Sequence, residues 1–131
     1  MANPNLFAAT TASGTTTYLT PGGTTALVLV PNAASSGQVF KINQIVAANV
    51  NGSAAVDTTV SIYTNGAQAQ GSAPSSGTAY PIVSTVSVPA DASLIVVDKT
   101  TAVYLMEGSS IIVTSGTASG ITYTISYEVI S

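Results

Sequence analysis

Hydrophobic and polar residues alternate along much of the chain, most regularly near its C-terminus. Between Ile121 and Val129 every odd-numbered residue is hydrophobic, and every even-numbered residue is Thr, Ser or Glu. Successive side chains of a strand point to opposite faces, so this period of two predicts a strand with one face on a core and the other in water. Similar apolar runs, separated by turn residues, predict strands at 24–30, 37–50, 54–64, 79–88, 93–98, 101–107, 109–115 and 120–130.

Two of these strands carry an expectation about which residues are buried. In 37–50 the hydrophobic residues at even positions, beginning with Phe40, predict a buried even face that a bulge or bend interrupts. In 54–64 the even positions share one face with Val60, and the odd positions, Tyr63 among them, share the other.

Turn residues delimit the predicted strands. Asn51-Gly52 and Asn65-Gly66 are expected to supply the positive φ angles of tight turns, and Glu107-Gly108 is expected to do similar work. No segment sustains the 3.6-residue period of a helix. About eight strands with short connections predict an all-β chain, folded as a single antiparallel β-sandwich of jelly-roll or immunoglobulin-like type.

Two segments lack a strand pattern. Residues 1–20 are polar with few apolar points and are expected to form an extended N-terminal arm, which leaves residues 21–131 as the sandwich domain. Residues 65–78 are rich in Gly, Ala, Ser and Gln, and are expected to form a loop that is mobile unless a partner pins it.

Charge is scarce in this chain. Only 5% of the 131 residues are charged, against about 25% in an ordinary globular domain, whereas 46% are hydrophobic. Apolar strands without flanking charges adhere to one another when their edges are exposed. The composition therefore favours a subunit of a permanent assembly, whose neighbours cover those edges, over a monomer solubilised by hydroxyl and amide groups.

The residue types that carry most enzyme chemistry are missing. The chain has no His and no Cys, so a Ser-His-Asp triad cannot be assembled, and neither Lys41 nor Lys99 lies in a recognisable Ser-Lys motif. Asp91, Asp98 and Glu107 have oxygen ligands for calcium, but their spacing matches no calcium loop. We expect no enzymatic activity, no cofactor and no metal site.

Several classes of partner are not expected. Two basic residues and a net charge of −3 disfavour nucleic-acid binding, which needs basic charge. The longest purely apolar run, 26–30, is far short of a membrane span, and the first residues lack the features of a signal peptide. Tyrosine side chains can stack on sugars, so glycan binding stays open.

Two long stretches, 35–63 and 84–131, resemble a family of small virion structural proteins of tailed phages, especially marine cyanophages. The resemblance implies a capsid-decorating or other accessory component on the outer surface of the phage particle. The chain departs from the family at Ser109, where Asp often follows Glu-Gly, and in the 65–78 loop, which is longer than usual. The pieces that carry the resemblance, in chain order, are KINQIVAANVNG (41–52), VPADASLIVVDK (88–99), YLMEGSSI (104–111) and ISYEVIS (125–131).

Composition and resemblance together predict a non-enzymatic virion protein, a capsid decoration or cement protein that stabilises the head. Its partners would be the major capsid protein or other virion proteins, and it would form a homo-oligomer, with a trimer favoured. The alternatives are a neck, tail or fibre-associated component, or a glycan-binding adhesion module. The residues expected to contact partners are Leu6, Phe7, Gln68, Gln70 and Pro74.

Overall fold

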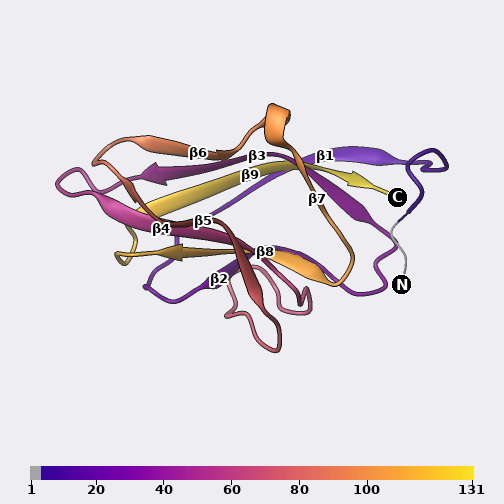
Figure 1. Ribbon diagram of the computed structural model, residues 1–131, viewed down its shortest axis with the longest axis horizontal. Helices are drawn as coiled ribbons and strands as arrows, with labels where there is room; N and C mark the ends of the chain where they lie inside the picture. The colour runs from indigo at the N-terminus through magenta and orange to yellow at the C-terminus, as the bar shows by residue number, and fades with distance from the viewer. Residues whose placement is uncertain (1–3) are drawn as a thin grey trace.

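Two antiparallel sheets make up the computed structural model, which describes residues 4–131 (Figure 1). The first sheet has the strand order β1-β9-β3-β6, and β7 also pairs with β3; the second has the order β2-β8-β4-β5. The strands of the first sheet are β1 (Ala12–Leu19), β9 (Ile121–Ile130), β3 (Val39–Asn49), β6 (Ser93–Val97) and β7 (Val103–Leu105). Those of the second are β2 (Leu27–Asn32), β8 (Ser109–Ser115), β4 (Val56–Tyr63) and β5 (Ala79–Val88).

The all-β prediction is confirmed for the described residues. The only helical element among them is the short 3-10 turn η1 (Lys99–Thr101), which joins β6 to β7. All eight predicted strands are present. The bounds of β5 and β8 agree with the predicted 79–88 and 109–115, and the other strand ends lie within three residues of their predicted positions.

One hydrophobic core lies between the inward faces of the two sheets. The first sheet contributes residues such as Ile42 and Ile45, and the second contributes residues such as Val60 and Ile111, all fully buried. Fully burying an aliphatic side chain of this size contributes about 1.5–3 kcal/mol relative to leaving it exposed. The alternation at the C-terminus is confirmed at Ile121, Tyr123 and Ile125, which are fully buried in this core.

Tyr123 joins the two sheets through its hydroxyl group. This hydroxyl donates a hydrogen bond to the Thr114 carbonyl oxygen at 2.8 Å and shares a second hydrogen bond with the Thr58 hydroxyl. Burial raises the pKa of Tyr123 to about 12, against the lowering effect of the Thr58 hydrogen bond. A buried tyrosine needs such polar partners, because an unpaired hydroxyl in a core costs free energy.

A bulge in β3 changes the face that is buried. The pairing of β3 with β9 shifts between Ile42 and Gln44, as the predicted bulge requires. Phe40 and Ile42 are buried on the even face before the shift, whereas Ile45 and Ala47 are buried after it. The prediction of a buried even face is therefore right for the first half of the strand and wrong for the second, because one extra residue inverts the alternation.

The 65–78 loop covers part of the outer face of the second sheet. Tyr63 lies on that face, yet it is buried in a small cluster with Val28 and Ile112. The loop is held there by hydrogen bonds from the Gly77 N–H to the Tyr63 hydroxyl oxygen, and from the Gly71 N–H to the Val28 carbonyl oxygen, at 2.9 and 2.8 Å. The expectation that only a partner would pin this loop is wrong, because the chain pins it itself.

The N-terminal region forms a strand that the sequence pattern did not predict. β1 pairs with β9 over its whole length, from Ala12 opposite Ile130 to Leu19 opposite Tyr123. The prediction of an extended arm over 1–20 is therefore wrong for residues 12–19. β1 is an edge strand that is mostly exposed on both faces, so burial imposes no alternation on its sequence. Residues 4–11 lie outside the sheets, and residues 1–3 lie outside the described residues.

Two predicted turns use a different mechanism. Gly108 has a positive φ of 75°, as expected, but Asn51-Gly52 and Asn65-Gly66 do not. Their Asn side chains accept hydrogen bonds two residues on: Asn51 from the Ser53 N–H and Asn65 from the Ala67 N–H, both at 3.0 Å. These are Asx-turns, in which the side chain substitutes for a backbone carbonyl.

Candidate functional site

The acidic residues near the end of β6 and before β8 stabilise turns. Asp98 caps η1, where its Oδ1 accepts hydrogen bonds from the backbone N–H and the hydroxyl of Thr100, at 2.9 and 2.6 Å. These hydrogen bonds from Thr100 lower the pKa of the exposed Asp98 carboxyl. Glu107 accepts a hydrogen bond from the Gly37 N–H at 2.9 Å. In residues 4–131 no group of three or more His, Cys, Asp or Glu side chains could hold a metal ion.

The described part of the chain contains no helix that is long and apolar enough to cross a membrane. Its large exposed hydrophobic side chains are not evenly spread. Three of the eight in the described residues, Leu6, Tyr104 and Met106, line hollows at one end of the outer face of the first sheet, and a fourth, Phe7, follows Leu6 in the chain. We call this group and the two charged residues beside it the end patch: Leu6, Phe7, Lys41, Tyr104, Met106 and Glu128.

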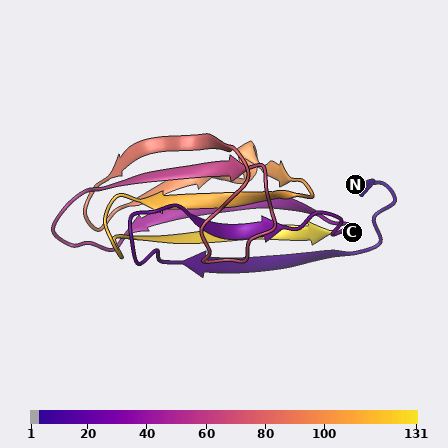
Figure 2. The same cartoon turned by 90° about the horizontal axis from the view of Figure 1, so that it is seen from below.

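Backbone hydrogen bonds hold the N-terminal segment against this end of the sheet. The N–H groups of Thr10 and Thr11 donate to the Ser131 carbonyl oxygen at 2.8 and 3.1 Å, and the Ser131 N–H donates back to Thr11 at 3.0 Å. The described N-terminal segment and the C-terminus therefore lie together, at one end of the molecule (Figures 1 and 2). These hydrogen bonds bring residues 4–9 over the outer face of the first sheet.

Leu6 helps to cover an apolar position of that face. Val39 has the outward parity of Lys41, opposite to that of the core residue Phe40, yet only 4% of its surface is exposed. It lines a shallow hollow of about 270 Å³ together with Pro4, Leu6, Tyr104 and Met106. The hollow is lined by hydrophobic residues and proline, and it opens to solvent beside half-exposed side chains.

Phe7 is the most exposed hydrophobic side chain in the described residues, with a relative exposure of 103%. A short turn presents it: the Ala8 N–H donates to the Asn5 carbonyl oxygen, and the Phe7 N–H donates to Asn5 Oδ1, both at 3.0 Å. Leaving the apolar Phe7 ring in water costs free energy in the isolated chain. Large exposed apolar groups of this kind mark contact sites.

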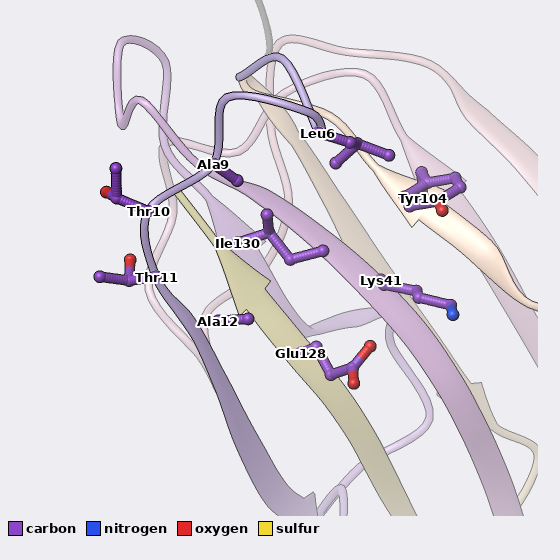
Figure 3. Close-up of a pocket in the computed structure, with 9 residues that line it drawn as sticks. All are labelled: Leu6, Ala9, Thr10, Thr11, Ala12, Lys41, Tyr104, Glu128 and Ile130. Carbon is purple, nitrogen blue, oxygen red and sulfur yellow. The ribbon is translucent and has the colours of Figure 1, made fainter.

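Three residues of the end patch form a row across the sheet. Lys41 on β3 lies directly opposite Tyr104 on β7 and directly opposite Glu128 on β9. All three line a second hollow, of about 410 Å³, and Figure 3 shows Lys41 and Glu128 on adjacent strands with Leu6 and Tyr104 beside them. Although cross-strand neighbours are close enough to interact, no ion pair or hydrogen bond joins these two charges to each other or to any other described residue.

The expected contact residues do not form one site. Leu6 and Phe7 belong to the end patch, whereas Gln68, Gln70 and Pro74 lie in the 65–78 loop. Gln70 Nε2 donates to the Thr17 hydroxyl and to the Tyr18 carbonyl oxygen at 3.0 and 3.3 Å. The loop, which also forms backbone hydrogen bonds with Val28 of β2, therefore reaches β1, the edge strand of the first sheet. Gln68 donates to the Ser75 hydroxyl at 2.9 Å, within the loop, and Pro74 is half-buried.

The residues expected to contact partners did not include Lys41, Tyr104, Met106 or Glu128. Lys41 and Glu128 belong to a set of only seven charged residues, and that scarcity was the available signal. Their meeting depends on the register of β3 against β9, which local patterns do not encode. Comparison of the chain with protein-family models, with curated proteins and with solved structures finds no match.

Proposed function

We propose that this chain is a non-enzymatic structural protein of a tailed-phage virion, and that it decorates or cements the outer surface of the head. It would act as a homo-oligomer in contact with the major capsid protein or other virion proteins. The observation that carries the proposal is the end patch: a fully exposed Phe7 beside an apolar hollow, in a chain whose surface is otherwise poor in charge.

The strand order supports a jelly-roll type of sandwich, an architecture found in viral capsid proteins. The chain passes from one sheet to the other at each of the first three connections, from β1 to β4, and again between β5 and β6, between β7 and β8 and between β8 and β9. If β6 and β7 are taken as one interrupted strand, each sheet has four strands, in the orders β1-β9-β3-β6/β7 and β2-β8-β4-β5. Interleaving of this kind follows when a long antiparallel hairpin is wrapped into two sheets.

The segments that resemble phage virion proteins occupy the framework of the fold. They include β3, β4, β6, β7, β8 and β9, while the 65–78 loop lies outside them. The end patch draws Lys41, Tyr104, Met106 and Glu128 from these segments and adds Leu6 and Phe7 from the short N-terminal segment. We propose that residues 4–9 are the part of the expected arm that contacts partners.

The proposal is tested by rebinding the purified chain to particles that lack it. Wild type and a control variant, Tyr80→Ala, should bind equally, because Tyr80 is an exposed aromatic residue on β5, away from the end patch. Phe7→Ala should bind about tenfold more weakly or worse, since a buried aromatic anchor commonly contributes more than 1 kcal/mol. Failure of wild type to bind, or equal binding by Phe7→Ala, would contradict the proposal.

Copy number separates decoration from a neck, tail or fibre role. Hundreds of copies per particle support decoration, and six or twelve at one vertex support a neck or tail station. Quantitative mass spectrometry of purified particles, referenced to the major capsid protein, measures this number.

Glycan binding is a second candidate, favoured by one observation. Tyr104 is half-exposed beside Lys41 and Glu128 in the larger hollow, so an aromatic face lies next to a donor and an acceptor. Titration with neutral methyl glycosides, followed by NMR of the Tyr104 ring, tests it. Shifts in wild type that vanish in Glu128→Gln would support a sugar site, and no shift at high millimolar glycoside would exclude it.

A further inference from the structure

We infer that the end patch is a contact between two copies of this chain, in which Phe7 of one copy enters the apolar hollow of the other and Lys41 of one faces Glu128 of the other. The inference rests on the proposed function, because it names one of the contacts through which the virion protein would assemble. It goes further in stating that the first partner of the patch is the chain itself.

The end patch carries an apolar projection and an apolar hollow on the same surface. Phe7 projects fully into solvent from a hydrogen-bonded turn, and the hollow lined by Leu6, Val39, Tyr104 and Met106 lies beside that turn. Its volume of about 270 Å³ is enough to receive one aromatic side chain. The Phe7 ring does not line its own hollow, so the hollow is open to the ring of another copy.

The end patch also carries a cation and an anion that are adjacent but form no ion pair within the described residues. Lys41 and Glu128 occupy directly opposed positions on β3 and β9, and no ion pair or hydrogen bond engages either side chain within residues 4–131. Among residues 4–131 they are also the only charged residues that line the larger hollow. Placed against a second copy, each charge meets its opposite.

These two features together favour a second copy over an unrelated partner. A patch that binds a different protein needs only one half of each complementary pair, whereas this patch contains both halves of both pairs. Self-complementarity of this kind defines an isologous contact, which closes across a two-fold axis. The low charge of the rest of the surface leaves few competing electrostatic contacts.

The test uses two charge-reversal variants of the full chain, Lys41→Glu and Glu128→Lys. Each should be at least about tenfold weaker in self-association than wild type by sedimentation velocity, because each places like charges across the contact. An equimolar mixture of the two should form hetero-oligomers, since every protomer of one kind then meets opposite charges on the other. Each chain in the mixture keeps its own two like charges. Association that is regained on mixing must therefore come from contact between chains.

One control variant and one further test variant complete the experiment. Lys99→Glu reverses the other lysine, on η1 outside the end patch, and should associate like wild type. Phe7→Ser should lose association without loss of thermal stability, because the ring is exposed and makes no contact with the core. Circular dichroism confirms that all variants are folded.

The result that overturns the inference is a wild-type chain that stays monomeric at hundreds of micromolar, or a mixture that is no more associated than its components. Particle rebinding remains a separate measurement. A monomeric chain that still binds particles through Phe7 would refute the contact between copies and the homo-oligomeric state, but would leave the proposed role in decorating the particle intact. A chain that oligomerises through the end patch but never binds particles would refute the proposed function alone.

Discussion

The hydroxyl oxygen of Tyr63 accepts a hydrogen bond from the backbone N–H of Gly77 at 2.9 Å, and this contact fixes the 65–78 loop against the outer face of the second sheet. The Gly77 backbone lies so close to the ring that a Cβ at this position would approach Tyr63 Cε2 to 2.8 Å. A loop made of small and polar residues is therefore an ordered part of the fold.

Tyr63→Phe should release this loop. The substitution keeps the ring but removes the acceptor of the Gly77 N–H, at a cost of about 1 kcal/mol. Hydrogen exchange should become faster at the Gly77 and Gly71 amides, and should stay unchanged at Gly116, whose N–H donates to the Asp57 carbonyl oxygen at 2.8 Å. Unchanged exchange at Gly77 would mean that the Tyr63 hydroxyl does not hold the loop.

Gly66→Ala should be strongly destabilising. A Cβ on Gly66 would lie 2.2 Å from the Asn32 carbonyl oxygen and 2.6 Å from that of Ser109, and neither backbone atom can move without disturbing β2 or β8. We expect a loss of more than about 2 kcal/mol in urea unfolding. Gly22→Ala is the matched control, since its Cβ meets nothing within 4 Å and should change stability little. Equal stability of the two variants would contradict this packing.

Asn32→Leu should also destabilise the fold. Asn32 is fully buried, and its Nδ2 donates to the carbonyl oxygens of Gln38 and Leu105, both at 3.1 Å. Leucine has a similar volume but leaves both carbonyls without this donor, at a cost of about 1–3 kcal/mol for each acceptor left buried. Chemical denaturation measures the loss. A stability within about 0.5 kcal/mol of wild type would show that these bonds contribute nothing net.

Alkaline pH should weaken the fold through Tyr123. Burial raises its folded pKa to about 12 from the ordinary value of 10.0, so folding favours the neutral phenol. The stabilisation is complete below pH 10 and is lost as the pH rises from 10 towards 12. The melting temperature should fall in this window, and Tyr123→Phe should show a shallower fall. Burial also raises the pKa of Tyr127, so part of the slope should persist in the variant; an identical slope would contradict the assignment.

The strands could be predicted because burial on one face imposes alternation on the sequence. This holds for Ile121–Ile125, whose odd positions enter the core. It fails for β1, because an edge strand that is exposed on both faces needs only backbone pairing and β-branched residues such as Thr15 and Thr16. It fails halfway along β3, because the bulge after Ile42 changes parity and local sequence does not locate the extra residue.

The candidate site was predictable only in part. Leu6 and Phe7 were expected because apolar side chains stand out in a polar N-terminal segment. Lys41 and Glu128 are 87 positions apart in the sequence, and their meeting depends on the pairing of β3 with β9. The anchoring of the 65–78 loop through Tyr63 was likewise hidden, because a tyrosine on an outer face is ordinarily read as solvent-exposed.

The most direct measurement of the proposed function is a reconstruction of a purified tailed-phage particle that carries this chain. We expect many copies of a two-sheet density on the outer surface of the head, with the end patch, including Phe7 and Lys41, buried against a neighbouring subunit. Absence of the chain from the head shell, or its presence there with Phe7 exposed to solvent in every copy, would contradict the proposal.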